Sequence, residues 1–236
     1  MIVREGPAHL SDTVPVARAL ATRLSCETRR QQEELGRVVP CKVSCSACCK
    51  YLVPLSVPEA FRLVRDVGAL DASSRRHTEE ALAAAADIVV QAGPPALHES
   101  DCPDQEDPTH TVGRWYASLG LPCPLLSGDL CSLYSCRPIA CREHMVVSPP
   151  LHCEGFHPEQ GKLVDVPFSL TEALSRLASR VEQQPLEAVM LPLALEWAGH
   201  NASRDQCTWP AKELFATFVA VISEMAEEAG ISLAVA

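Results

Sequence analysis

Two cysteine-rich stretches dominate this sequence: CKVSCSACC at residues 41–49 and CPLLSGDLCSLYSCRPIACREH at residues 123–144. Each stretch contains four of the 12 cysteines in the chain, and Cys153 lies just beyond the second. Thiolates two or three residues apart on a turn can converge on one soft metal ion or on an iron–sulfur cluster. The spacing therefore predicts a metal-binding centre formed by both stretches, with the rest of the fold built around it.

The composition limits the class of protein. A chain of 236 residues with 47% hydrophobic residues can bury an adequate core without the help of disulfides. Its formal net charge of -10 argues against binding to nucleic acid or to an anionic membrane, because such binding needs a basic face. The expected partners are therefore a metal and, if that metal is redox-active, a protein redox partner, with no nucleic acid and no membrane.

The cellular compartment is inferred from two missing patterns. Residues 1–16 lack the basic region followed by about 7 to 15 apolar residues that marks a secretory signal. No later segment reaches the roughly 18 uncharged apolar residues of a membrane span. A cytoplasmic location is expected, and in that reducing compartment dense cysteines are more often metal ligands or redox-active thiols than disulfides.

Helical patterns flank the cysteine-rich stretches. Apolar residues at helical spacing predict a helix over residues 14–35, with Ser11 or Asp12 as its cap. A second helix is expected after Ser56, which can cap it, with Phe61, Leu63 and Val64 on its buried face. The fold class is therefore mainly α, with helices packed around an irregular cysteine-rich metal-binding centre. Further helices are expected at residues 73–91, 170–183, 186–199 and 210–230.

These patterns divide the chain into three segments. Residues 1–39 form an N-terminal helix, and residues 40–158 form a cysteine-cluster metal-binding domain with inserted helices. Residues 159–236 form a C-terminal helical segment that is expected to pack on the same domain.

The first stretch contains an unusual doublet. A gap of two residues between Cys45 and Cys48 lets both sulfurs face one metal, whereas the adjacent side chains of Cys48 and Cys49 generally diverge. The doublet therefore indicates two metals, two irons of one cluster, or one ligand beside a free thiol.

Cationic side chains flank the second stretch. Arg137 and Arg142 lie on either side of Cys141, and such neighbours lower a thiol pKa and offset the charge of a many-thiolate site. We therefore expect both arginines to support a bound cofactor, although solvated surface charges would give the same pattern. Pro124 and Pro138 stiffen the chain beside presumed ligands.

Over residues 40–153, these motifs resemble those of a known family. CSACC at residues 45–49, followed by CPLLSGDLCSLYSCRPIACR at residues 123–142, is similar to the CxxCxxCC family of zinc- or iron-chelating domains, the YkgJ-like cysteine-cluster proteins. The resemblance implies a metal-binding module without a shared reaction. Two features depart from the family pattern: three residues instead of two separate Cys41 from Cys45, and Cys136 occupies a variable position. The matching residues are Cys41, Cys45, Cys48, Cys49, Cys123, Pro124, Cys131, Tyr134, Arg137, Pro138, Cys141 and Arg142.

The expected metal ligands combine this resemblance with the spacing of the cysteines. His144 could add a nitrogen ligand or a hydrogen bond behind the ligands, and Glu143 is expected to be exposed. Cys26 and Cys207 stand alone and are expected to be ordinary cysteines, while the roles of Cys102 and Cys136 stay open. The expected ligands are Cys41, Cys45, Cys48, Cys49, Cys123, Cys131, Cys141 and Cys153.

Three functions are compatible with this pattern. More thiols are present than the four that one tetrahedral zinc uses, so an iron–sulfur cluster or iron with a redox or electron-transfer role is favoured over zinc. In the second, a structural zinc presents the helices to a protein partner. In the third, a low-pKa thiol such as Cys49, or an open metal position, supports enzymatic chemistry. The sequence lacks a Gly-rich phosphate loop, an HExxH helix and a GxSxG turn.

Overall fold

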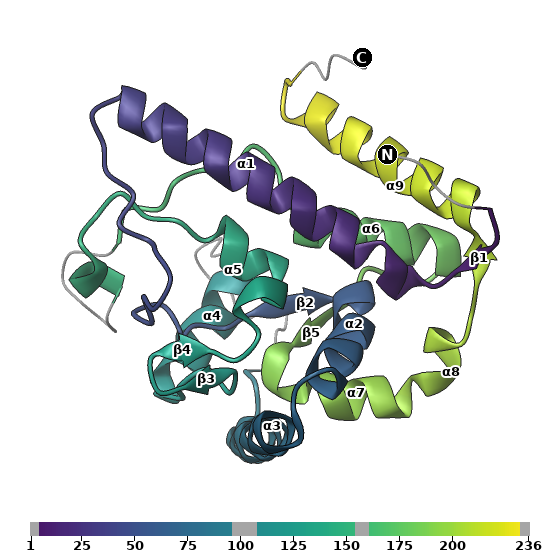
Figure 1. Cartoon of the computed structure of the whole chain (residues 1–236), viewed down its shortest axis with the longest axis horizontal. Coiled ribbons are helices and arrows are strands. Elements are labelled where there is room, and N and C mark those ends of the chain that lie inside the picture. Colours follow the sequence, from purple (N-terminus) through teal and green to yellow (C-terminus); the bar gives the residue numbers. More distant parts are fainter. Residues whose placement is uncertain (1–4, 96–107, 154–160, 232–236) are drawn as a thin grey trace.

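The computed structural model describes residues 5–95, 108–153 and 161–231. Over these ranges the protein is mainly α-helical, as predicted, and its strands form only short antiparallel pairs (Figure 1). None of the helices in these ranges is both long and apolar enough to cross a bilayer.

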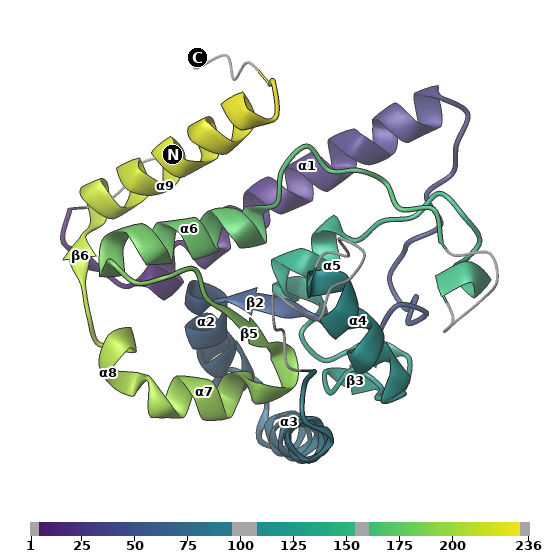
Figure 2. The same ribbon diagram turned by 180° about the vertical axis from the view of Figure 1, so that it is seen from behind.

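Three helices form one side of the molecule. Helix α6 (Leu170–Glu182) runs alongside both α1 (Val14–Glu34) and α9 (Ala211–Glu228), and the three share one apolar core (Figure 2). Leu174, Leu177, Leu214 and Phe218 are fully buried in this core. Strand β1 (Pro7–Ala8) pairs with β6 (Trp209–Pro210), which joins the start of the chain to the start of α9. All three helices lie where the apolar periodicity predicts them.

The start of α1 differs from the prediction. Ser11 and Asp12 lie in a 3₁₀ turn, η1 (Leu10–Asp12), and Thr13 precedes the helix without a side-chain capping bond. The Asp12 carboxylate instead accepts a hydrogen bond from the His9 backbone N–H at 2.8 Å. The prediction that Ser11 or Asp12 caps α1 was wrong, because both residues belong to a separate 3₁₀ turn that ends before the helix begins.

Helix α2 (Val57–Gly68) follows strand β2 (Pro54–Ser56) and connects two parts of the core. Ser56 and Glu59 form a capping box, which confirms the predicted helix start. Val57 and Phe61 face the core of α1, α6 and α9, while Ala60, Leu63 and Val67 face a second core cluster. These two faces leave Val64 outside, 43% exposed, so its predicted burial was wrong.

The second core cluster lies between α2 and the segment after α6. Helix α3 (Ala72–Ala92), seen end-on in Figure 1, lies where a helix was predicted over residues 73–91 and packs against η5 (Leu191–Leu193). The helix predicted over residues 186–199 is shorter: β5 (Ala188–Met190) pairs with β2, and only then follow η5 and α7 (Ala194–His200). The backbone of β2 needs hydrogen-bond partners, so this tertiary pairing overrides local helix propensity. A short helix, α8 (Ala202–Asp205), leads to β6.

The cysteine-rich region contains only short elements. Helix α4 (Pro108–Ser118) was not predicted, and after it come the hairpin β3 (Leu126–Ser127)–β4 (Leu130–Cys131) and the turn η3 (Tyr134–Cys136). Helix α5 (Ile139–Glu143) contacts both α1 and α6, and the turn η4 (Pro150–Cys153) ends this region. The division of the chain at residues 39 and 158 stays a prediction.

Candidate metal centre

Backbone and side-chain hydrogen bonds bring the two cysteine-rich stretches together. The backbone N–H of Cys123 donates to the Cys49 carbonyl oxygen at 2.7 Å. Ser46 Oγ donates to Oδ1 of Asp129, in the turn between β3 and β4, at 3.2 Å. Segments more than 70 residues apart in sequence therefore meet at the turn that carries the cysteine doublet.

Cys123 and Cys141 lie within electrostatic reach of each other and of both Cys48 and Cys131. We call these four thiols the thiol cluster. Burial raises the pKa of Cys141, and the nearby thiols of Cys123, Cys48 and Cys131 raise it further. Burial also raises the pKa of Cys123 to about 11, with Cys131 and Cys48 acting in the same direction. For Cys48 the largest cause of its raised pKa is a hydrogen bond with the Cys49 thiol. Without a cation, these thiols stay protonated at neutral pH.

Backbone N–H groups point at two of these sulfurs. The N–H of Leu125 bonds to the Cys123 sulfur, and the N–H of Leu133 bonds to the Cys131 sulfur. Each bond opposes the effect of burial by lowering the thiol pKa. The two-residue offset is the same in both cases, and N–H···S bonds of this kind stabilise metal-bound thiolates.

Arg137 adds a positive charge to the thiol cluster. Its guanidinium lowers the pKa of Cys48, Cys131 and Cys141, although burial and thiol neighbours outweigh it. The guanidinium carbon lies 4.6 Å from the centre of the Tyr134 ring, a cation–π contact that fixes its position.

Arg142 turns away toward α1. It donates to Thr22 Oγ1 at 2.9 Å and to the carbonyl oxygens of Ser135 at 2.6 Å and Arg137 at 3.2 Å. It still lies within electrostatic reach of Cys141.

The remaining expected ligands occupy different surroundings. Cys49 lies next to the thiol cluster, whereas Cys41 packs against the apolar side chains of Val39, Met145 and Val164. Cys45 is half-buried, and no partner for its side chain is found among the described residues.

Cys153 is buried near the edge of the thiol cluster. Its carbonyl oxygen accepts a hydrogen bond from the Tyr51 hydroxyl at 2.9 Å. Burial is the largest cause of the raised pKa of Tyr51, and the charges of Cys153 and Cys48 raise it further. The Tyr51 hydroxyl therefore lies within electrostatic reach of both thiols. Of the other cysteines, Cys26 and Cys207 are exposed and Cys136 is half-buried, while Cys102 lies outside the described residues.

Glu143 and His144, which follow Cys141 closely in the sequence, have surroundings that the sequence did not show. The His144 ring lies 6.0 Å from the Tyr51 ring, edge to face, and its buried Nε2 has no hydrogen-bond partner among the residues that the structure describes. Burial lowers the His144 pKa, which favours the neutral imidazole that metals bind. Glu143 is half-buried instead of exposed: it accepts hydrogen bonds from Ser169 Oγ at 2.8 Å and from the Leu170 N–H at 2.6 Å. Burial raises its pKa to about 7.

Sequence reasoning missed the role of Glu59 at this centre. Its Oε1 accepts a hydrogen bond from the backbone N–H of Ile139, the first residue of α5, at 2.9 Å. Because Cys141 lies in α5, Glu59 positions a member of the thiol cluster from another helix. The Ser-x-x-Glu spacing predicts the cap of α2, but the second partner of this carboxylate depends on tertiary packing.

The donor atoms of this site fit a soft metal. Zinc or iron bound by thiolates is supported by groups of the kinds found here: thiols, N–H···S bonds, a nearby guanidinium and an imidazole nitrogen. The imidazole nitrogen is His144 Nε2, which has no hydrogen-bond partner among the described residues. Within residues 5–95, 108–153 and 161–231, however, no three Cys, His, Asp or Glu side chains are arranged to hold an ion. The structure therefore shows a gathering of thiols, and a complete coordination shell would require further movement of their loops.

Comparison with known proteins identifies the family. No curated protein and no solved structure gives a significant match. The family model CxxCxxCC, described as "Putative zinc- or iron-chelating domain", matches residues 40–156, a range that contains all eight expected cysteine ligands. This match supports metal binding. Through residues 40–156, the chain belongs to the CxxCxxCC family of zinc- or iron-chelating domains.

Proposed function

We propose that the protein is a cytoplasmic metal-binding protein that holds iron, as an iron–sulfur cluster or a mononuclear ion, and has a redox or electron-transfer role with a protein partner. The observation that supports this most directly is the thiol cluster itself, in which Cys48 lies within electrostatic reach of Cys123 and Cys141 from a distant part of the sequence. These four are the proposed central ligands. Cys49 and Cys153 lie at the edge of the site, and Cys41 and Cys45 complete the proposed set.

The raised thiol pKa values explain why the site needs a cation. Four half-buried thiolates would repel one another, because the other thiols of the cluster already raise the pKa of Cys123 and Cys141. A metal replaces the thiol protons and removes this repulsion, so metal binding releases protons and stabilises the fold around the ligands. Residues 41–50 contain no helix or strand, so this segment can move toward the other ligands when the metal binds.

Iron is favoured over zinc by the number of thiols. The thiol cluster contains as many thiols as a tetrahedral zinc takes ligands, and Cys49 and Cys153 are additional nearby sulfurs. An iron–sulfur cluster would supply one-electron redox chemistry, whereas zinc has none. The residues of the chain would tune that chemistry through burial, the N–H···S bonds and the charge of Arg137.

The test is anaerobic purification followed by elemental analysis and visible and electron paramagnetic resonance spectroscopy. We expect bound iron and visible absorbance that bleaches on reduction. The double variant Cys48→Ser/Cys141→Ser should lose the iron, while Cys26→Ser, which changes an exposed cysteine, should retain it. A colourless protein with stoichiometric zinc and no iron would refute this function.

A structural zinc is the second candidate, and the contacts of α5 favour it. This helix carries Cys141, packs against α1 and α6, and is bound at its start by Glu59. A metal there would hold the helices together so that they present a surface to a protein partner. Removal of zinc by a chelator should then increase amide hydrogen exchange in α5 and in the adjacent turns of α1 and α6.

A further inference from the structure

A second site lies between α1, α2 and the segment that follows β4. It is a pocket of about 290 Å³, lined by Arg18 and Thr22 of α1, Arg62 of α2, and Ser135, Cys136 and Arg142. Three of these residues are arginines, although the chain has a formal net charge of -10. Such a local concentration of positive charge in an acidic protein needs a physical explanation.

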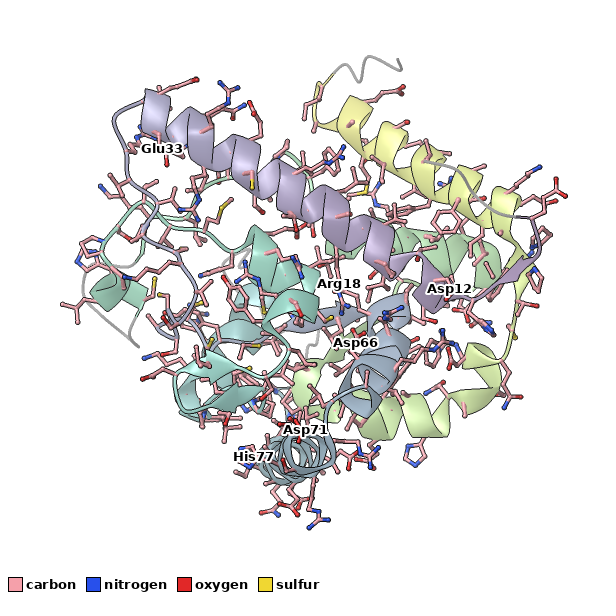
Figure 3. All side chains as sticks on the ribbon, viewed as in Figure 1. Asp12, Arg18, Glu33, Asp66, Asp71 and His77 are labelled. Carbon is pink, nitrogen blue, oxygen red and sulfur yellow. The ribbon has the colours of Figure 1, made fainter. Side chains whose placement is uncertain are left out.

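One carboxylate accepts hydrogen bonds from two of the three guanidinium groups. Asp66 accepts hydrogen bonds from Arg18 Nη1 at 2.6 Å and from Arg62 Nε at 2.8 Å. Figure 3 shows Arg18 on α1 facing Asp66 on α2. Three arginines and this carboxylate leave a net charge of 3 - 1 = +2 at the pocket. Glu59 also lies within electrostatic reach of Arg18, and counting it as fully ionised still leaves +1.

Several N–H groups of these arginines have no acceptor within the described part of the chain. The Nε of Arg18 is buried without a hydrogen-bond partner, and Arg62 uses only its Nε with the residues that the structure describes. The three hydrogen bonds of Arg142 all go to uncharged oxygens. A guanidinium has five N–H donors in one plane, and this geometry matches the oxygens of phosphate or carboxylate groups.

We propose that this pocket binds a small oxyanion of the phosphate class, either free phosphate or the phosphate group of a small phosphomonoester. The volume of about 290 Å³ suits such a ligand, because pockets for larger organic ligands begin at about 300 Å³. The acidic charge of the whole chain opposes a polyanion such as nucleic acid. Because Arg142 directly follows Cys141, a bound anion also restrains the segment that carries part of the thiol cluster.

Isothermal titration calorimetry on the full chain, purified with its metal, tests this proposal. Inorganic phosphate and glycerol phosphate are titrated at constant ionic strength, with chloride as the reference anion. We expect saturable binding with a Kd of about 1 mM or tighter. Arg62→Gln should weaken binding about tenfold, because one charged hydrogen-bond donor is lost. Asp66 retains its bond from Arg18 in this variant, so the fold is preserved.

Arg65→Gln is the matched control. Arg65 lies on the same helix but pairs with Asp12 and Asp205 outside the pocket, so phosphate affinity should not change. Thr22→Val is a second variant, because Thr22 accepts a bond from Arg142 at the pocket wall; it should weaken phosphate binding several-fold. The metal content of every variant is measured, so that loss of anion binding is distinguished from loss of the metal.

Each outcome has a definite meaning. Tighter binding of glycerol phosphate than of phosphate identifies an ester ligand, and equal or weaker binding identifies the free ion. The absence of saturable phosphate binding, or equal affinity in wild type, Arg62→Gln and Thr22→Val, overturns the proposal. A single-stranded oligonucleotide that binds more tightly than phosphate, and loses affinity in Arg62→Gln, overturns the assignment to a small anion.

Discussion

The Glu59 carboxylate in α2 accepts a hydrogen bond from the backbone N–H of Ile139, where α5 begins, at 2.9 Å. Its other oxygen accepts bonds from the backbone N–H and the hydroxyl of Ser56, and the residue is only 1% exposed. One buried side chain therefore caps α2 and fixes the start of the helix that carries Cys141. The stability of the fold and the position of a proposed metal ligand depend on the same group.

Glu59→Ala should destabilise the protein and reduce its metal content. The change removes the acceptor of the Ile139 N–H and both bonds to Ser56, and buried donors without partners cost about 1–3 kcal/mol each. We expect a loss of roughly 2–4 kcal/mol in the free energy of unfolding, measured by urea titration. Glu79→Ala, at an exposed position of α3, is the control and should change stability by less than about 0.5 kcal/mol. An unchanged stability for Glu59→Ala would contradict this interpretation.

The ion pair between Arg18 and Asp66 should matter far more than the ion pairs on the surface. Its side chains are 9% and 4% exposed, and loss of one partner leaves a buried charge without compensation. Asp66→Ala should therefore cost about 3–5 kcal/mol in unfolding free energy. Glu27→Gln, which breaks an exposed pair with Arg30, should cost far less than Asp66→Ala. Similar losses in the two variants would show that the Asp66 pair is effectively solvated.

Arg137 should determine the pH at which the metal is taken up. Its charge lowers the pKa of Cys48, Cys131 and Cys141, so removing it raises these values and keeps the thiols protonated to a higher pH. For Arg137→Gln we expect the midpoint of metal uptake to rise by about 0.5–1 pH unit, with the metal bound above the midpoint and lost below it. Spectroscopic metal titrations at a series of pH values provide the measurement.

Two variants keep this pH experiment specific. Arg137→Lys retains the charge and should restore most of the wild-type midpoint, although it loses the stacked guanidinium above Tyr134. Arg75→Gln, at an exposed position of α3, should leave the midpoint unchanged. A midpoint that Arg137→Gln does not move would exclude an electrostatic role for Arg137.

The proposed ligands should differ in their importance for metal binding. Cys123→Ser and Cys131→Ser remove sulfurs of the thiol cluster that also accept N–H···S bonds, and we expect at least a tenfold loss of metal affinity for each. Cys41→Ser changes a thiol packed among apolar side chains and should have a smaller effect. Competition with a coloured chelator measures these affinities, with Cys207→Ser as the exposed control. Equal losses for Cys41→Ser and Cys131→Ser would place Cys41 among the central ligands.

Local sequence patterns predicted most of the helices because their causes are local. The capping box of Ser56 and Glu59 lies at the start of α2, and Gly93 directly follows the last residue of α3. The predicted helix at residues 186–199 was shortened because β5 pairs with β2, a strand more than 130 residues earlier in the chain. The sequence shows the propensity of residues 188–190, but it does not show that the backbone of β2 needs a partner there.

The sequence by itself determined the kind of site. Its closely spaced cysteines specify soft sulfur donors, and the apolar periodicity specifies helices around them. Only the tertiary structure decided that Cys48 lies within electrostatic reach of Cys123 and Cys141, while Cys41 packs in an apolar group and Arg142 turns toward Thr22. The physical reason is that these choices depend on contacts between distant segments, such as those from Cys123 to Cys49 and from Glu59 to Ile139. Such contacts form only when whole helices pack together, so no local pattern encodes them.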